Sequence, residues 1–402
     1  MKKIPYARQL IDRNDIKAVC KVLCADYLTQ GPKISEFESV IASYCQAKYV
    51  VAVSSGTAAL HLACLAVGLK KGDEVITSPI TFVASSNSIL YTGAKPVFAD
   101  IDEGDACINT EQIAKKVNSK TRAIIPVDFA GYPCDLEKIK AIAKRNKCFV
   151  IEDAAHALGA QYRIKGSGLS DKNRWIKVGS CRHSDMTVFS FHPVKSITTG
   201  EGGAITTNNK EYYEKLIMLR QHGITKDSSK FLNPYHLSHN PDKWYYEMQY
   251  LGFNYRLTDI QCALGISQFS KLDFFLQRRK KIVSKYNDSF KNLDEVLPLQ
   301  NKDFAESANH LYVLRFKPDK FKCKKDKIFD EYHKNGILVN FHYIPVYLQP
   351  YYQQLGYKRG LCPKAEEYCR EALTLPLYPA MSDSDVKRVI QITKKIIKKC
   401  KS

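Results

Sequence analysis

The stretch Thr187-Val188-Phe189-Ser190-Phe191-His192-Pro193-Val194-Lys195-Ser196 begins as an alternating apolar strand and ends in a turn that carries one lysine. Gly200-Glu201-Gly202-Gly203-Ala204-Ile205 follows, so we expect two strands joined by a loop that contains Lys195. A lysine at a rigid strand end beside Phe189 and Phe191 is placed to lose charge by desolvation. An amine that forms a Schiff base needs this loss, although a surface lysine is the simpler interpretation of the segment alone.

Strands and helices alternate in the chain that precedes this stretch. Apolar runs and helical spacing predict strands at 49–54, 74–78, 96–99, 123–127 and 149–151, and helices at 57–67, 82–91 and 136–145. Such regular alternation indicates an α/β fold with a doubly wound, mostly parallel sheet. Ligands of these sheets bind at the carboxyl ends of the strands, so the residues that follow each strand are the candidates for a site.

The first predicted strand is followed by Ser54-Ser55-Gly56-Thr57-Ala58-Ala59-Leu60, a glycine turn that opens a helix. Free N–H groups and the positive end of a helix bind anions, and neighbouring hydroxyls add donors. The segment is neither a Walker A loop nor a G-x-G-x-x-G motif. We predict that Ser55, Gly56, Thr57 and Ala58 bind a phosphate, with a simple helix cap as the alternative.

Two further strand ends carry side chains with suitable chemistry. Glu152-Asp153-Ala154-Ala155-His156 follows the strand near 149–151, and a carboxylate there can contact a cationic heterocycle or cap a helix. Phe82, after another strand, can stack on a ring or belong to the core. These residues join Lys195 at the same edge of the predicted sheet.

A phosphate site, a carboxylate and a desolvated lysine, in this order, are typical of a pyridoxal phosphate site. The phosphate would anchor the cofactor, and Asp153 would keep the ring nitrogen protonated so that the ring withdraws electrons from the substrate. Lys195 would hold the cofactor as a Schiff base. Once released, it would move a proton between the two carbons that exchange the amine.

Composition indicates an ordinary globular protein. The chain has 402 residues, of which 45% are hydrophobic and 25% charged, and its length favours one large and one smaller domain. The start, Met1 to Tyr6, has no apolar stretch of a secretory signal, and no apolar run approaches the roughly 20 residues that span a bilayer. We therefore expect a soluble, cytoplasmic protein that does not bind a membrane.

Net charge and cysteine content give only weak evidence about the class of function. The net charge is +20, yet 61 basic residues are interleaved with 41 acidic ones, and no nucleic-acid-binding motif accompanies them. Thirteen cysteines are scattered without a C-x-x-C pair, so we expect reduced thiols and no metal site. A basic surface suits an anionic metabolite as well as a nucleic acid.

Six motifs, spread over almost the whole chain, resemble those of the DegT/DnrJ/EryC1/StrS sugar aminotransferases. They are Leu28-Thr29-Gln30-Gly31-Pro32, the turn Ser55-Gly56-Thr57-Ala58-Ala59-Leu60, Glu152-Asp153-Ala154-Ala155-His156, Ser190-Phe191-His192-Pro193-Val194-Lys195, Gly252-Phe253-Asn254-Tyr255-Arg256 and His342-Tyr343-Ile344-Pro345. The resemblance implies the fold of aspartate aminotransferase, fold type I of the pyridoxal phosphate enzymes.

The resemblance also implies a role for each matching residue. Lys195 is the Schiff-base lysine, Asp153 the partner of the ring nitrogen, and His156 a residue that lies over the ring. The phosphate is bound by Gly56, Thr57, Ala58 and Ser190, and by Asn254 of the neighbouring subunit, which implies a homodimer with shared sites. Positions that line the sugar-nucleotide site are Tyr6, Leu28, Thr29, Gln30, Arg256, His342 and Tyr343. A diphosphate suits the planar fork of Arg256, with a surface ion pair as the alternative.

The segments Leu28-Thr29-Gln30-Gly31, Val127-Asp128-Phe129-Ala130-Gly131 and Phe341-His342-Tyr343-Ile344-Pro345-Val346-Tyr347 are most similar to the branch that serves pseudaminic acid biosynthesis. This implies transfer of an amino group, from glutamate through pyridoxamine phosphate, to C4 of a UDP-linked 4-keto-6-deoxy-N-acetyl-hexosamine. Alternatives are another nucleotide-linked keto sugar or, in a different class, a basic nucleic-acid-binding regulatory protein.

We expect an N-terminal arm at 1–14, a large cofactor-binding domain at 15–265 and a small α+β domain at 266–402. In the last of these, helices are predicted at 283–293, 324–335 and 382–399, and a strand at 308–316. The polar stretches 162–181 and 225–246 are predicted to be long loops.

Overall fold

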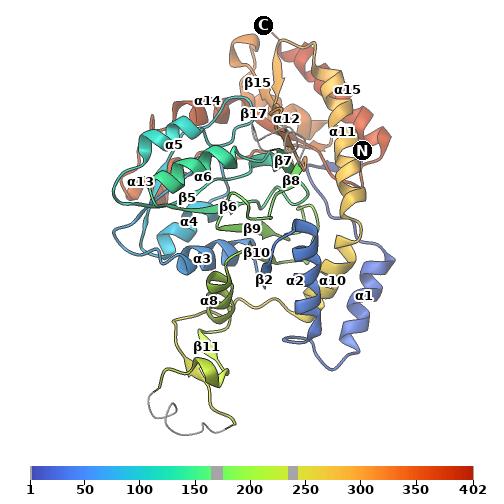
Figure 1. Cartoon of the computed structure of the whole chain (residues 1–402). Coiled ribbons are helices and arrows are strands. Elements are labelled where there is room, and N and C mark those ends of the chain that lie inside the picture. The colour runs from blue at the N-terminus through green and yellow to red at the C-terminus, as the bar shows by residue number, and fades with distance from the viewer. Residues whose placement is uncertain (1, 164–174, 234–242, 402) are drawn as a thin grey trace, which may run out of the picture.

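The computed structural model describes residues 2–163, 175–233 and 243–401, and a seven-stranded sheet forms its centre (Figure 1). In spatial order the strands are β2 (Tyr49–Val53), β10 (Gly203–Thr207), β9 (Met186–Ser190), β6 (Phe149–Asp153), β5 (Thr121–Ile125), β3 (Glu74–Thr77) and β4 (Lys95–Phe98). Four pairings, β4–β3, β3–β5, β5–β6 and β6–β9, are parallel, whereas β10 runs antiparallel to β9 and β2. The predicted α/β fold with a mostly parallel sheet is confirmed.

Both faces of this sheet are buried, because successive side chains of a strand point to opposite sides. In β9, Val188 belongs to one apolar cluster and Phe189 to the other. Helices that contribute to the Phe189 cluster are α2 (Pro32–Cys45), α5 (Thr110–Lys116) and α6 (Leu136–Arg145). Helices of the Val188 cluster are α3 (Gly56–Ala66), α4 (Ala84–Tyr91) and α8 (Lys210–Arg220).

The C-terminal part has its own apolar core around a three-stranded antiparallel sheet. Its elements are β13 (Val296–Pro298), β15 (Tyr312–Phe316) and β17 (Ala372–Leu375), with α11 (Leu272–Phe290), η3 (Pro318–Lys320), α12 (Lys325–Lys334) and α15 (Asp383–Cys400). Near the N-terminus, β1 (Ile4–Pro5) pairs in parallel with β16 (Ile337–Leu338), which holds the start of the chain against this core.

Residues 346–371 leave the small core and pack on the large one. Buried tyrosines of η4 (Val346–Leu348), α13 (Pro350–Gln354) and α14 (Pro363–Glu371) belong to the same apolar cluster as Phe189. The neighbouring segment 340–343 is thereby brought to the edge of the large sheet. Near the start of the chain, α1 (Arg13–Leu23) packs on α10 (Asp259–Phe269).

Two predictions for the C-terminal part had wrong boundaries. The helix expected at 283–293 is α11, which begins at Leu272. Its buried side includes Arg279, whose guanidinium donates to the carbonyls of His310 and Leu377, so a charged residue interrupts the apolar pattern. The strand expected from 308 begins only at Tyr312, because Asn309 has a φ of 50° and cannot continue an extended strand.

The two predicted long loops contain regular structure at their ends. In the first, β7 (Gln161–Arg163) pairs with β8 (Trp175–Lys177) and with β14 (Ala305–Glu306). At the second, β11 (Ile224–Thr225) pairs with β12 (Glu247–Met248), and η2 (Ser228–Lys230) follows β11. Within the predicted loops, the prediction was wrong for Tyr162, Arg163, 175–177, Thr225 and 228–230, whereas 164–174 and 234–242 lie outside the described residues.

Over the described ranges, no helix is both long and apolar enough to cross a membrane. All thirteen cysteines are described and carry free thiols. The predicted domain boundaries after residues 14 and 265 fall inside α1 and α10, and the division into domains stays a prediction.

Candidate active site

A cavity of about 530 Å³ opens at the carboxyl ends of the central strands. The predicted site residues that line it are Tyr6, Ser55, Gly56, Thr57, Phe82, Asp153, His156, Ser190, Lys195, His342 and Tyr343. The N-terminal arm, the large sheet and the segment that returns from the C-terminal part therefore meet at one place. That meeting could not be read from any single motif.

Lys195 enters the cavity from the loop between β9 and β10. The backbone N–H of Phe191 donates to Gly202, and that of Thr199 donates to Phe191, so the loop closes on itself. The Lys195 N–H donates to the carbonyl of His192 over 2.9 Å. Burial lowers the pKa of Lys195 to about 8, against the opposing effect of Asp153. About a tenth of this amine is therefore uncharged at pH 7, several hundred times more than for an ordinary lysine.

Asp153 ends β6 and is buried on the same cavity. Its Oδ2 accepts a hydrogen bond of 2.5 Å from the Ser85 hydroxyl, and its Oδ1 accepts the N–H of Ala155 at 3.2 Å. The Thr81 hydroxyl lies 2.6 Å from that of Ser85. Burial raises the pKa of Asp153, while Ser85, Ala155 and Lys195 favour its ionised form. A cationic partner in the cavity would therefore stabilise the carboxylate further.

His156 lies against a second histidine, His310, that the sequence analysis missed. Their ring centroids are 4.3 Å apart, and both side chains are buried. Burial lowers the pKa of each ring well below its usual value, so both are neutral. Within the described residues, the Nδ1 atoms of both rings are buried and have no hydrogen-bond partner. The His156 ring is therefore held by packing and has hydrogen-bonding capacity left for a ligand.

The N-terminus of α3 faces the cavity and can bind an anion. The Ser55 hydroxyl caps this helix by accepting the N–H of Ala58 over 3.0 Å. The N–H groups of Gly56 and Thr57 precede the first intrahelical bond and remain available. A Cβ on Gly56 would approach the Cβ of Ser190 to 2.9 Å, so only glycine permits this close packing. Ala58, also predicted here, uses its N–H in the cap and does not line the cavity.

Aromatic side chains form the open side of the cavity. Phe82 remains 59% exposed and its ring lies 6.3 Å from that of Tyr343. The Tyr6 ring lies 5.4 Å from that of His342, whose Nδ1 is 2.8 Å from the Thr374 hydroxyl. Burial lowers the pKa of His342 to about 3, so this ring is neutral. A planar ligand could therefore stack at the mouth without meeting a cation from these residues.

Besides Ala58, five predicted residues do not line the cavity of their own chain. They are Leu28, Thr29, Gln30, Asn254 and Arg256. Leu28 to Gln30 run beside the start of α10, with a bridge between Thr29 and Thr258, and are exposed. Arg256 is bridged to Val53, and Asn254 to Gln221. Their predicted roles stay predictions.

The residues of the cavity fit pyridoxal phosphate. An anion site with free N–H groups, a buried carboxylate and a lysine of lowered pKa surround one cavity. The unpartnered Nδ1 of His156 adds a polar contact for a ring substituent. Elsewhere in the described residues, no group of three or more His, Cys, Asp or Glu side chains is arranged to hold a metal ion. Fold and site together define the class of pyridoxal phosphate enzymes of fold type I.

Comparison with known proteins places the chain within that class. Residues 9–394 match the DegT/DnrJ/EryC1/StrS aminotransferase family, and the chain belongs to this family. It is 40% identical to the spore coat polysaccharide biosynthesis protein SpsC of Bacillus subtilis, over 98% of this chain and 97% of that protein. It is 38% identical to the UDP-4-amino-4,6-dideoxy-N-acetyl-beta-L-altrosamine transaminase of Campylobacter jejuni, over 99% and 98%.

Solved structures agree with this assignment. Helicobacter pylori PseC, an aminotransferase involved in the biosynthesis of pseudoaminic acid, superposes with a TM-score of 0.88 at 33% identity, covering 99% of this chain and 100% of that one. The PLP form of the putative sugar aminotransferase Spr1654 from Streptococcus pneumoniae reaches 0.87 at 30% identity, covering 99% of each. The predicted family, fold, enzyme class and cofactor are confirmed, and the nucleic-acid-binding alternative gains no support.

Proposed function

We propose that the chain transfers an amino group, from glutamate, to C4 of UDP-2-acetamido-2,6-dideoxy-β-L-arabino-hex-4-ulose, a step in pseudaminic acid biosynthesis. The observation that carries the proposal is the placement of Lys195, Asp153 and the start of α3 on one cavity in a chain of this family. The sugar is supported by the 38% identity to a transaminase named for the aminated product.

Pyridoxal phosphate, when bound, supplies an electron-withdrawing ring that stores the amino group between the two half-reactions. We assign the chain's residues as follows. The N–H groups of Gly56 and Thr57, with the Ser190 hydroxyl, bind the phosphate. Asp153 holds a proton at the ring nitrogen, and Ser85 orients its carboxylate.

The Nζ of Lys195 serves first as the nucleophile that binds the cofactor and then as a base. With a pKa near 8 it can take a proton from a carbon and return it to a neighbouring carbon at neutral pH. Phe82, Tyr343 and His342 enclose the mouth of the cavity, where they limit water around the reacting carbons. We assign Tyr6, which lines the cavity, to contact the sugar.

A panel of nucleotide sugars tests the substrate. With glutamate as donor, kcat/KM for the UDP-linked 4-keto-6-deoxy-N-acetyl-hexosamine should exceed that for 3-keto sugars, 4-keto-pentoses and dTDP-linked 4-keto hexoses. We expect at least about a tenfold difference, which a few specific polar contacts provide. Product formation is measured by chromatography and mass spectrometry. Equal or higher kcat/KM for another member would contradict the proposed sugar while leaving the aminotransferase assignment intact.

The identity to SpsC favours a second candidate within the same chemistry. This relative is named for spore coat polysaccharide and is 40% identical, slightly more than the altrosamine transaminase. The alternative substrate is therefore another nucleotide-linked keto sugar, destined for a surface polysaccharide. The same panel distinguishes the two candidates.

We further propose that the enzyme is a homodimer with shared sites. Asn254 and Arg256, implied by family resemblance to bind ligand, lie away from the cavity of their own chain. Exposed apolar side chains surround them in sequence: Met248 is 63% exposed and Leu251 is 82% exposed. A second copy would cover these side chains and receive Asn254 and Arg256 at its cavity.

Subunit mixing tests this arrangement. Lys195→Ala and Arg256→Ala should each be strongly impaired, because one lacks the amine and the other the guanidinium. After refolding or subunit exchange of an equal mixture, activity should recover to about one quarter of wild type, since half of random dimers are mixed and carry one intact site.

The matched control is a mixture of Lys195→Ala and Asp153→Asn, two defects that lie on the same chain's cavity. No mixed dimer then has an intact site, so activity should stay low. Recovery of activity in the control mixture would contradict shared sites. So would the absence of recovery in the mixture of Lys195→Ala and Arg256→Ala, provided that the protein has a dimeric mass in solution.

A further inference from the structure

Two carboxyl groups lie buried against each other behind the cavity. Asp128 has no exposed surface and Glu152, which directly precedes Asp153, is 1% exposed. The Oδ1 of Asp128 accepts the backbone N–H of Cys134 at 2.9 Å. The Oε2 of Glu152 accepts the hydroxyls of Thr187 at 2.5 Å and of Ser184 at 3.2 Å.

The other oxygen of each carboxyl group has no donor among the described residues. These atoms are the Oδ2 of Asp128 and the Oε1 of Glu152. The two residues lie on adjacent strand ends, because Val127 pairs in parallel with Asp153 and the Asp128 N–H donates to the Asp153 carbonyl, and each carboxyl group affects the pKa of the other. Neither can donate when ionised, so a hydrogen bond between them requires a proton on one carboxyl group. If both carboxyl groups were ionised, two neighbouring negative charges would be buried without a cationic partner in the described part of the chain.

We propose that Asp128 and Glu152 share one proton and act together as positioning residues for Asp153. The pair then carries one negative charge, and every oxygen has a partner. The pair can position Asp153 because backbone hydrogen bonds connect the two strand ends. The N–H of Asp128 donates to the Asp153 carbonyl at 3.0 Å, and the Asp153 N–H donates to the Pro126 carbonyl at 2.9 Å. The shared proton therefore joins the ends of β5 and β6 at the residue that faces the cofactor ring.

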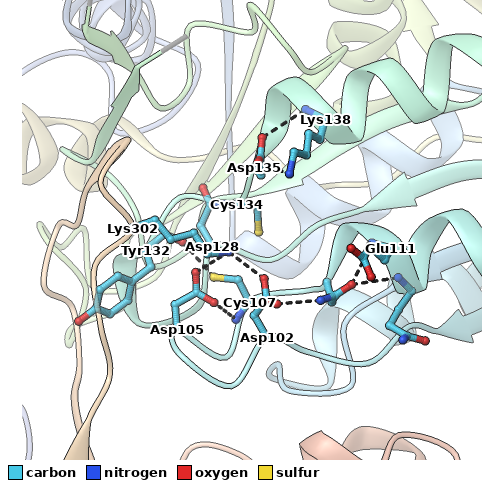
Figure 2. A network of polar contacts seen from close by, with 12 residues as sticks. Asp102, Asp105, Cys107, Glu111, Asp128, Tyr132, Cys134, Asp135, Lys138 and Lys302 are labelled. Atoms are coloured by element: carbon cyan, nitrogen blue, oxygen red, sulfur yellow. Dashed lines mark hydrogen bonds and ion pairs between the residues drawn. The ribbon is translucent and has the colours of Figure 1, made fainter. Parts of the chain in front are cut away.

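The turn that carries Asp128 also belongs to a second polar network, which includes Cys107, Tyr132 and Lys302 (Figure 2). The Cys107 thiol donates to the Tyr132 carbonyl at 3.3 Å, and the Cys107 N–H donates to Asp105 at 2.9 Å. Lys302 pairs with Asp105 at 2.9 Å. The Cys134 thiol donates to the Val127 carbonyl at 3.2 Å, which holds the Cys134 N–H in place for the carboxyl group of Asp128.

Apart from Asp153 and the Lys302–Asp105 ion pair, the titratable groups around the Asp128–Glu152 pair are neutral around pH 7. Burial raises the pKa of Cys181 to about 11 and also raises the pKa values of Cys45 and Tyr162. Its interaction with Cys107, together with burial, raises the pKa of the Cys134 thiol, and burial raises the pKa of Cys107 as well. Burial raises the pKa of both carboxyl groups in the pair, most strongly that of Asp128. The shared proton is thus the charge-changing element of this cluster, beside Asp153 itself.

The sign of the pH dependence follows from the raised pKa. The folded protein keeps a proton that the unfolded chain releases near pH 4, so the stability from this pair is complete at low pH and is lost as pH rises toward the folded pKa. Asp128→Asn and Glu152→Gln supply an N–H donor in place of the shared proton and keep one negative charge. The free energy of unfolding of these two variants should therefore not fall in this way as pH rises.

The experiment measures unfolding in urea by the cofactor-loaded full chain at pH 5, 6 and 7. Relative to wild type, each single amide variant should gain up to about tenfold in the folded-to-unfolded ratio for each pH unit between 5 and 7. Because wild type and variants share Asp153, its own titration cancels in the comparison. The same pH slope in wild type and both single variants would overturn the shared proton.

A second readout tests the positioning role. The double variant Asp128→Asn with Glu152→Gln removes the last negative charge, whereas each single variant keeps it. The pH midpoint of the cofactor's visible absorbance should fall by about half a pH unit or more in the double variant and stay within about 0.2 in the single ones. An unchanged midpoint in the double variant would show that the pair acts on folding alone and would overturn its role toward Asp153. This test uses no sugar, so its outcome is independent of the proposed substrate.

Discussion

Replacing Lys195 with alanine is expected to reduce the rate of transamination by at least about 10³-fold, which corresponds to ~4 kcal/mol of transition-state stabilisation. The reason is that one Nζ atom performs two tasks, binding of the cofactor and proton transfer between neighbouring carbons. Burial that lowers its pKa to about 8 makes the neutral amine available near pH 7. The measurement is initial rate with saturating sugar and glutamate, at matched cofactor content.

Lys195→Arg is the informative companion variant, because it keeps a positive charge and a long side chain but supplies no nucleophilic amine. It should be as impaired as the alanine variant. Added methylamine should restore part of the activity to Lys195→Ala, since a small amine can enter the vacated volume. Lys210→Ala, on the exposed start of α8, serves as a control that should match wild type. Retention of full activity by Lys195→Ala would refute the mechanism.

The large sheet could be predicted because its strands are short, apolar and buried on both faces. Tyr49–Val53 and Glu74–Thr77 are examples where the expected and observed strands differ by one residue at one end. Prediction was poorer in the C-terminal part, where Arg279 is buried in α11 and its charge is satisfied by backbone carbonyls. No local pattern shows that a helix buries an arginine, because the carbonyls come from other segments of the chain.

Some residues of the candidate active site could likewise be predicted from the sequence, and others could not. Lys195, Asp153 and Gly56 follow strands, so their common edge follows from the topology of a parallel sheet. Ser85 and His310 were missed, since each acts through a neighbour distant in sequence: Ser85 reaches Asp153 across 68 residues, and His310 packs on His156. Asp128 was noted within a motif, but its pairing with Glu152 depends on the register of β5 beside β6.

Asp153→Asn is expected to lower kcat/KM by about 10²-fold or more. The isosteric amide keeps the hydrogen bond from Ser85 but loses the negative charge that holds a proton at the ring nitrogen, and removal of one preorganised electrostatic contact typically costs this much. The ring would then withdraw electrons less strongly, so the proton transfer by Lys195 should become rate-limiting. A primary deuterium isotope effect with α-deuterated glutamate, larger than in wild type, measures this change.

Ser85→Ala separates the charge of Asp153 from its orientation. This variant removes only the 2.5 Å hydrogen bond to Oδ2 and leaves the carboxylate ionised by a cationic ring. We expect a loss of about tenfold, because one hydrogen bond to a charged group contributes ~1.5 kcal/mol or somewhat more. From highest to lowest kcat/KM, the order should therefore be wild type, Ser85→Ala and Asp153→Asn. If Asp153→Asn were as active as Ser85→Ala, the carboxylate would serve only to hold the ring in place, and the electronic role assigned to it would be wrong.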